Sequence, residues 1–285
     1  MSSEPLDPTG SRPRRPGPTV RTRVVELGSD GTERRHEDRL ATEEPLEVRL
    51  AWPGVPARRV WLTMRTPGHD FELAAGWLVH EGIAAVDQIA GVAYCTDAEL
   101  APEQEFNVVT VTLTTPPVVE PGQRHESRST GSSACGVCGK DSIADALAVS
   151  SGARWMGGLP APDVVRRLPE VLREQQRTFA RTGGVHAAGL FEADGTLLVA
   201  REDVGRHNAV DKVTGARVLA GRPVAASCLV VSGRAGFELV QKAVACGVGA
   251  LVSVGAPTSL SAQLARDSGI ALYGFTSAAR CVRYS

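Results

Sequence analysis

Helix-type and strand-type patterns alternate through the second half of the chain, and this alternation restricts the fold more than any other feature. Apolar runs separate stretches whose apolar positions repeat at helical spacing. The predicted strands are Val185–Glu192, Thr196–Arg201, Ala226–Val231, Ala250–Val254 and Ile270–Phe275. The predicted helices are Asp141–Val149, Asp163–Thr182, Asn208–Leu219, Phe237–Ala245 and Ser259–Asp267. Such a series is typical of a layered α/β domain with a mostly parallel sheet, which we assign to residues 141–285.

The first half of the chain has a different pattern. Alternating apolar and polar residues predict strands at Val20–Leu27, Leu46–Trp52, Arg59–Arg65, Ile89–Tyr94 and Phe106–Leu113. A single helix is predicted after Asp70, a candidate N-cap, and it ends at Gly82. Residues 20–115 are therefore expected to form a smaller α+β subdomain.

Two stretches lack any regular pattern. Residues 1–19 contain five prolines and three arginines, and such a composition buries too little apolar surface to become ordered. We predict a disordered basic tail there, with a binding arm as the alternative. Residues 116–140, rich in Pro, Gly, Ser and charge, are predicted to form a flexible loop at the boundary between the two domains.

Composition excludes several classes of protein. The 285 residues are 42% hydrophobic and 22% charged, with a formal net charge of -1, so no overall field attracts nucleic acid or a membrane surface. The N-terminus lacks the apolar segment of a signal peptide, and no run reaches the roughly 18 apolar residues of a membrane helix. Six cysteines in a chain of this length do not make a disulfide framework. We expect a cytoplasmic protein.

The predicted loop ends in Cys135-Gly136-Val137-Cys138-Gly139-Lys140, which places two thiols among glycines. Sulfur chemistry needs a thiolate, and a nearby cation or helix N-terminus lowers the ordinary cysteine pKa of about 8.5. Lys140 and the helix predicted from Asp141 would supply both. A structural zinc site needs four ligands, and no second pair of this kind accompanies Cys135 and Cys138. We therefore expect a reactive sulfur and no stable zinc.

Three polar corners lead from a predicted strand into a predicted helix: Arg201–Asn208, Ser232–Gly236 and Gly255–Ser259. In open α/β sheets, ligands lie beyond the carboxyl ends of the strands, and the first amides of a helix favour anions. Arg206 and Arg234 would add planar donors suited to phosphate. Together the corners suggest a nucleotide-like ligand with several phosphates, whereas each corner alone is equally consistent with a tight turn.

Other candidate residues have simpler interpretations. His186 lies in an apolar strand pattern, which favours a core histidine over a ligand-binding one. Cys228 and Cys246 lie in apolar runs and are interpreted as inert core residues. Cys95 and Cys281 have no partner nearby in the sequence.

Four separated motifs resemble, in order, those of the FdhD/NarQ family, the accessory sulfurtransferases of molybdenum-dependent formate dehydrogenases. They are Thr66–Leu78, Cys135–Lys140, Glu202–Lys212 and Ser232–Arg234. The resemblance runs from about Glu43 to the C-terminus and leaves the basic tail outside.

The resemblance implies a three-layer α/β/α C-terminal domain similar to cytidine deaminases, preceded by a smaller α+β subdomain. Deaminases need an H-x-E motif and a P-C-x-x-C zinc site. Here His186 is followed by two alanines, and no proline precedes Cys135. Deaminase chemistry is therefore not expected.

The resemblance also implies a task. Sulfur would pass from a cysteine desulfurase, as a persulfide on Cys135, to the molybdenum bis(molybdopterin guanine dinucleotide) cofactor (Mo-bis-MGD) before its insertion into apo formate dehydrogenase. Cys138 would have an auxiliary role. The expected cofactor contacts are Phe275, Thr276, Ser277, Ala278, Ala279 and Arg280 from the family's C-terminal segment, together with Arg206, His207, Ser232, Gly233 and Arg234. We also expect a homodimer.

Two other functions remain open. One is a non-catalytic chaperone that binds the cofactor or the apo-dehydrogenase. The other is a disulfide oxidoreductase, whose C-x-x-C would begin a helix directly after a strand. A long polar stretch precedes Cys135 instead, and this disfavours the redox interpretation.

Overall fold

The computed structural model describes residues 15–96, 100–121 and 152–285. Cys135, Cys138, Lys140 and the predicted helix Asp141–Val149 lie outside these residues. So do most of the predicted tail and most of the predicted loop.

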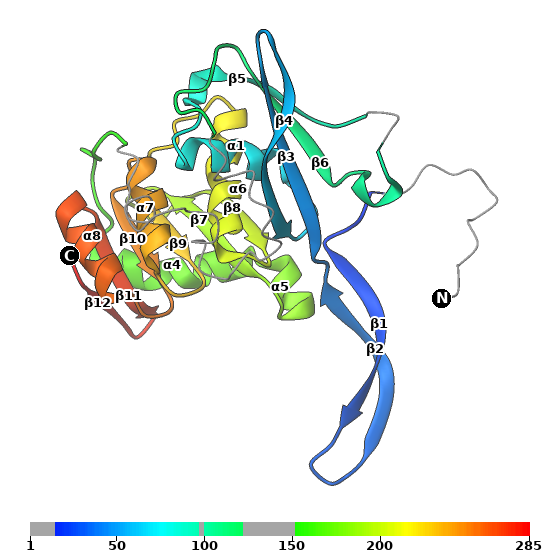
Figure 1. The fold of residues 1–285 in the computed structure, drawn as a ribbon. Helices are drawn as coiled ribbons and strands as arrows, with labels where there is room; N and C mark the ends of the chain where they lie inside the picture. The colour runs from blue at the N-terminus through cyan, green and yellow to red at the C-terminus, as the bar shows by residue number, and fades with distance from the viewer. Residues whose placement is uncertain (1–14, 97–99, 122–151) are drawn as a thin grey trace.

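A six-stranded sheet forms the centre of the larger domain (Figure 1). Its order is β12-β11-β10-β9-β7-β8, with β7 at His186–Phe191, β8 at Leu197–Asp203, β9 at Cys228–Val231, β10 at Ala250–Ser253, β11 at Ala271–Ser277 and β12 at Arg280–Arg283. The strands β9, β10 and β11 pair in parallel, whereas β7 is antiparallel to both of its neighbours and β12 is antiparallel to β11. Since β8 then runs in the same direction as β9, the strands β8, β9, β10 and β11 all end at one edge.

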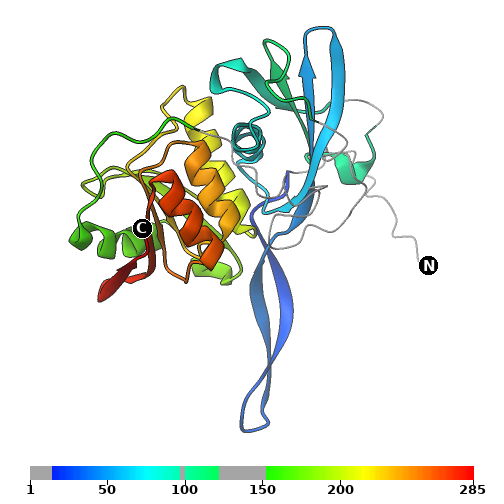
Figure 2. The same ribbon diagram turned by 60° about the vertical axis from the view of Figure 1, so that its left-hand side comes forward.

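Helices cover both faces of this sheet. One face carries α6 (Arg206–Leu219), α7 (Phe237–Ala245) and α8 (Ser259–Ser268), which lie side by side in Figure 2. The other face carries α4 (Pro162–Glu174). Successive residues of β9 supply the two cores, Leu229 to the first and Val230 to the second, because side chains alternate across a strand. The domain is thus layered, with a mixed sheet, and its likeness to cytidine deaminases stays a prediction.

The predicted helix Asp163–Thr182 is two helices. The first, α4, ends at Glu174, and α5 follows at Arg177–Thr182. The carboxylate of Glu202 accepts hydrogen bonds of 2.8 Å from the amides of Thr178 and Phe179 in the first turn of α5. A distant acidic side chain therefore fixes a helix start that no local capping residue indicates.

The smaller domain is a four-stranded sheet covered by one helix (Figure 1). Its order is β4-β3-β6-β5, with β3 at Glu44–Trp52, β4 at Val55–Arg65, β5 at Ile89–Tyr94 and β6 at Val108–Leu113. The helix α1 spans Asp70–His80, and short 3₁₀ turns occur at Val86–Gln88 and Pro102–Gln104. Leu46, Leu73 and Trp77 belong to a core separate from those of the larger domain.

Asp70 is not the N-cap of α1, which corrects the sequence prediction. The N-cap position is His69, and Asp70 is the first helical residue. Its buried carboxylate receives hydrogen bonds of 3.0 and 3.2 Å from the buried guanidinium of Arg65, and one of 2.7 Å from Tyr94 Oη. Asp70 therefore neutralises a buried arginine instead of capping the helix.

A two-stranded ribbon projects from the body of the protein (Figures 1 and 2). It pairs β1 (Thr19–Leu27) with β2 (Glu33–Ala41) in antiparallel register. The strand β2 was not predicted. Six of the nine residues in its sequence, ERRHEDRLA, are charged, and a ribbon without a buried face imposes no apolar alternation on its residues.

The two domains meet at an interface where α1 crosses α6. This interface holds the candidate site in place. In Figure 2, α1 is seen end-on between α6 and the smaller sheet. Gly76 and Gly215 let the helix backbones touch, since a Cβ at Gly215 would lie 1.8 Å from the carbonyl oxygen of Glu72. Beside them, both oxygens of the Glu72 carboxylate accept hydrogen bonds from Arg201 of β8.

We expect the Glu72–Arg201 contact to depend on pH. Burial favours the neutral acid, but hydrogen bonds from Arg201 and His69 outweigh it and lower the pKa of Glu72 from 4.5 to about 2. A carboxyl whose pKa falls on folding adds stability above its unfolded value, and this contribution is lost as pH falls through the folded value.

Replacement of Glu72 by Gln should therefore cost about 1.5–3 kcal/mol at pH 7, the range for hydrogen bonds to charged groups. The difference in the free energy of unfolding between the wild type and the Glu72→Gln variant should decrease from about pH 5 towards pH 2. Urea unfolding of both proteins at several pH values measures this difference. A difference that stays constant across that range would contradict the assignment.

Candidate functional site

The three polar corners lie on one edge of the large sheet. This edge is formed by the carboxyl ends of β8, β9, β10 and β11, and the antiparallel strand β7 begins there. The pairing of His186 with Asp203 and of Ala188 with Val231 fixes the start of β7 between the first two corners. The backbone also connects the corners, because the amide of Gly255 donates to Gly233 and that of Phe275 donates to Gly255.

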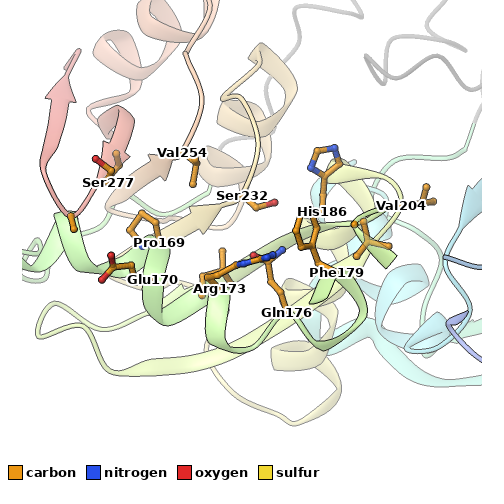
Figure 3. A pocket seen from close by; sticks show the side chains of 16 residues that line it. Pro169, Glu170, Arg173, Gln176, Phe179, His186, Val204, Ser232, Val254 and Ser277 are labelled. Atoms are coloured by element: carbon orange, nitrogen blue, oxygen red, sulfur yellow. The ribbon is translucent and has the colours of Figure 1, made fainter. Parts of the chain in front are cut away.

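A cavity of about 750 Å³ opens between this edge and the helices α4 and α5. Figure 3 shows its two walls. The helical wall contains Glu170, Arg173, Gln176 and Phe179, and the opposite wall contains His186, Val204, Ser232, Val254 and Ser277. Leu172, Thr276 and Ala278 also line the cavity. The lining combines apolar side chains and glycines with polar ones, among them the charged Glu170 and Arg173, and cofactor sites likewise pair an apolar lining with polar groups.

Three predicted contact residues, Ser232, Thr276 and Ser277, bring hydroxyl groups to this cavity. Ser232 Oγ accepts a 2.9 Å hydrogen bond from the amide of Ala187, so its own proton can still be donated. Thr276 is only 2% exposed, and its Oγ1 has no hydrogen-bond partner among the described residues. A buried hydroxyl at a cavity wall favours a ligand or water that completes its hydrogen bonding.

His186 also lines the cavity, which corrects its interpretation as a core histidine. It is half-buried, and a Cβ at Gly233 would lie 3.4 Å from its Nδ1. Burial and the positive charge of Arg206 lower the pKa of His186, so the imidazole is neutral at pH 7. The apolar pattern around His186 predicts a core position, and this pattern does not reveal that β7 is antiparallel to β9 and therefore begins at this edge.

The remaining predicted contacts lie beside the cavity and are absent from the described lining. Ala279 and Arg280 lie at the exposed turn between β11 and β12, with the Arg280 guanidinium 5.6 Å from the Phe275 ring centre. Ser277 and Ala278, by contrast, line the cavity. The corner residues Arg206, His207, Gly233 and Arg234 lie on the same sheet edge but do not line it.

Much of the Glu202–Lys212 motif maintains the structure. Asp203 is fully buried, and its carboxylate accepts hydrogen bonds from the amide of Gly205, from Asn208 and from Lys212, the last at 2.6 Å. It also accepts one from the amide of Thr66 in the smaller domain. These contacts hold the first corner against the smaller domain, and so the motif sets the position of Arg206.

His207 is largely buried next to Lys242 and Arg206. Burial and these two cations lower the pKa of His207 to about 3, so the ring is neutral at pH 7. Its Nε2 lies 3.6 Å from Glu238 Oε2. A neutral histidine at this place can donate or accept one hydrogen bond but adds no charge for a phosphate.

The three helix starts on this edge differ in capping. The side chain of Thr258 accepts a hydrogen bond from the amide of Ser261, and Ser261 Oγ accepts one from the amide of Thr258, so α8 caps itself. For α6, which begins after Gly205, no side-chain cap occurs among the described residues. The first corner is therefore better suited to an anion than the third.

The described residues form neither a cluster of metal ligands nor a helix that could span a membrane. Within residues 15–96, 100–121 and 152–285, no three His, Cys, Asp or Glu side chains gather closely enough to hold a metal ion. Cys135 and Cys138 lie outside those ranges, so the expectation of no stable zinc stays a prediction. In the same part of the chain, the helices are too short or too polar to cross a bilayer.

Comparison with known proteins connects this site to a family. The family model described as FdhD/NarQ matches residues 41–285. The sulfur carrier protein FdhD of Streptomyces avermitilis is 46% identical over 264 residues, which is 90% of each chain. The protein of the same name from Mycobacterium tuberculosis is 46% identical over 267 residues, covering 90% of this chain and 93% of that one.

A solved structure shares the fold. The crystal structure of a Desulfotalea psychrophila protein, described as a formate dehydrogenase accessory protein, superposes with a TM-score of 0.71 and 22% identity, covering 94% of this chain and 97% of that chain. The family match includes the C-x-x-C and every residue that lines the cavity. This chain therefore belongs to the FdhD/NarQ family.

Proposed function

We propose that this protein is a sulfurtransferase that carries sulfur, as a persulfide on Cys135, from a cysteine desulfurase to Mo-bis-MGD for formate dehydrogenase. One observation carries the proposal: relatives named as sulfur carrier proteins are 46% identical over 90% of this chain. The C-x-x-C motif lies within the residues matched by the family model. The intact mass of the full chain, incubated with a desulfurase and cysteine, should rise by one sulfur atom.

A covalent carrier fits the chemistry of the C-x-x-C. A persulfide holds sulfur without releasing free sulfide, and formation of the adduct splits one transfer into two steps. Cys138 would pass the sulfur on, resolve the persulfide or tune Cys135. Lys140 supplies a nearby cation in the sequence, which favours the thiolate that such chemistry needs.

The cavity supplies a site for the nucleotide part of the acceptor. A guanine dinucleotide has flat bases, riboses and diphosphates. The apolar walls with the hydroxyls of Ser232 and Thr276 suit the uncharged parts. The start of α6 and the guanidinium of Arg206, on the same sheet edge, suit a diphosphate.

Guanosine diphosphate should therefore bind to the purified chain, and guanosine more weakly. Replacement of Arg206 by Ala should weaken the diphosphate by about 1.5–3 kcal/mol, the value of a hydrogen bond to a charged group. Titration calorimetry measures both affinities. Arg222 lies in the exposed turn beyond the opposite end of α6, so Arg222→Ala is the matched control and should bind as the wild type does. Equal affinity for guanosine and its diphosphate would refute the phosphate site.

A chaperone that holds the cofactor without transferring sulfur is the second candidate. The cavity is compatible with it, since a pocket with many apolar side chains can hold a cofactor whether or not sulfur is transferred. The two functions differ in what the thiols do: a chaperone would bind nucleotide but take up no sulfur. A disulfide oxidoreductase would show neither property.

We also propose that the protein is a cytoplasmic homodimer and that its larger domain resembles cytidine deaminases. The ribbon of β1 and β2 is a candidate contact between copies. Val25 and Leu27 on it are 49% and 72% exposed, and an isolated two-stranded ribbon is marginally stable in water.

A further inference from the structure

A buried cluster at the joint between the domains combines a thiol, an imidazole and a carboxylate. His80 ends α1, Asp211 and Thr214 belong to α6, and Cys246 directly follows α7. His80 Nδ1 lies 2.5 Å from Asp211 Oδ1, and His80 Nε2 lies 3.1 Å from Thr214 Oγ1. Thr214 Oγ1 lies 3.7 Å from Cys246 Sγ. The carboxylate therefore orients the imidazole, and the Thr214 hydroxyl lies between the imidazole and the thiol.

The charges in this cluster favour a protonated imidazole. Burial disfavours the imidazolium, but interactions with Cys246 and Asp211 outweigh it and raise the pKa of His80 to about 9. Lys242 Nζ shares the same oxygen of Asp211 at 2.8 Å, and Glu238 lies 3.8 Å from Lys242. Both ring nitrogens of His80 therefore donate, one to Asp211 and the other towards Thr214 and Cys246.

Cys228 is a second buried cysteine and serves as a comparison, because no imidazole or carboxylate partner of its thiol occurs among the described hydrogen bonds. Cys228 lies in β9 with 0% exposure, and burial alone raises the pKa of its thiol. Its Sγ contacts only the carbonyl of Leu229, at 3.7 Å, among the described hydrogen bonds. Cys246 is 4% exposed, so the two thiols differ in their partners far more than in their burial.

Described residues before and after the segment 122–151 also contact the surroundings of the cluster. On one side, the amide of Val118 donates to the carbonyl of Ile83, three residues after His80. On the other side, Gly152 packs against Ala245, next to Cys246, since a Cβ there would lie 2.4 Å from the Ala245 carbonyl oxygen. The described flanks of the C-x-x-C segment are thus attached close to His80 and Cys246.

We propose that Cys246 is a second sulfur-accepting thiol, activated by His80 and positioned with the help of Asp211 and Thr214. The proposal rests on the sulfur-carrier function and extends it to a site away from the cavity. The thiolate form of Cys246, which the protonated His80 stabilises, attacks the outer sulfur of a small persulfide such as glutathione persulfide. The donor's S–S bond breaks as the new one forms, and the departing thiolate takes the proton from His80. No external oxidant or reductant is needed.

The test uses the full chain carrying Cys135→Ala and Cys138→Ala, so that failure of the main carrier site does not decide the outcome. Glutathione persulfide is the sulfur donor, and peptide mass spectrometry after alkylation locates the added sulfur. We expect uptake at Cys246, reversed by dithiothreitol, and none at Cys228. In the same background, His80→Asn and Thr214→Val should each slow uptake at least severalfold.

Thermal unfolding of each variant identifies those that fold. If His80→Asn does not fold, Thr214→Val decides, since valine keeps the branched shape of threonine and replaces the hydroxyl between the ring and the sulfur with a methyl group. An unmodified Cys246 in the folded parent would overturn the proposal. The proposal would also be overturned if the folded variants took up sulfur at the same rate as the parent protein.

Discussion

Replacement of Gly215 by Ala should destabilise the protein by about 3 kcal/mol or more, at the upper end of the costs of overpacking. The new Cβ would lie 1.8 Å from the carbonyl oxygen of Glu72 and 2.5 Å from its carbonyl carbon, so the helices α1 and α6 must separate. Because these are backbone atoms, no change of rotamer relieves the clash. Gly76→Ala should behave in the same way, since its Cβ would lie 1.9 Å from the carbonyl oxygen of Asp211.

The sign of the stability change in Gly215→Ala shows whether helix packing or helix propensity dominates at this position. In an unconstrained helix interior, Ala is favoured over Gly by about 1 kcal/mol, so propensity alone predicts stabilisation by Gly215→Ala. Urea unfolding measures the change. The control is Gly91→Ala in β5, where a Cβ would meet nothing within 4 Å and a small effect is expected. A Gly215→Ala protein as stable as the wild type would show that the helices do not cross in contact.

The outline of the larger domain could be predicted because its strands and helices are buried on predictable faces. The predicted strand Ala226–Val231 contains β9, and the predicted helix Phe237–Ala245 coincides with α7. Apolar runs of this kind record burial directly. Strand β12 was not predicted because the exposed residues Arg280 and Arg283 interrupt any apolar run there.

The direction of a strand is not recorded in its own residues. Residues His186–Phe191 are equally apolar whether β7 runs parallel or antiparallel to β9, and only pairing across the sheet decides. The apolar pattern around His186 therefore predicts a core histidine although the residue lines the cavity. The prediction of one long helix over Asp163–Thr182 failed for a similar reason, since Glu202, far away in the sequence, caps α5.

The candidate site could be predicted only at residues whose side chains suggest a ligand and whose position in the predicted fold is at the sheet edge. Ser232 and Thr276 were expected contacts and do line the cavity, whereas Arg173 and Phe179 were not considered because α4 and α5 approach the edge through tertiary packing alone. The polar residues of Glu202–Lys212 suggested a ligand, yet Asp203 and Lys212 are paired in the interior. A polar motif therefore does not distinguish a ligand site from a buried ion-pair network.

Replacement of Cys135 by Ala should abolish the desulfurase-dependent uptake of sulfur. In the proposed carrier mechanism this thiolate is the covalent attachment point, and alanine offers no atom to attack the donor. Incubation with a desulfurase and cysteine, followed by intact mass and peptide mapping, measures the uptake. Cys135 lies outside the residues that the structure describes. Thermal unfolding of the variant would therefore establish separately that the fold is intact.

The matched variant Cys138→Ala separates the roles left open for the second thiol. If Cys138 only tunes Cys135, the variant should still gain one sulfur atom, more slowly. If Cys138 resolves or passes on the persulfide, the adduct on Cys135 should persist longer than in the wild type. The chaperone function predicts a third pattern, in which neither substitution matters because the wild type itself gains no mass. An adduct of unchanged size and rate in Cys135→Ala would place the carrier sulfur on another cysteine and overturn the assignment.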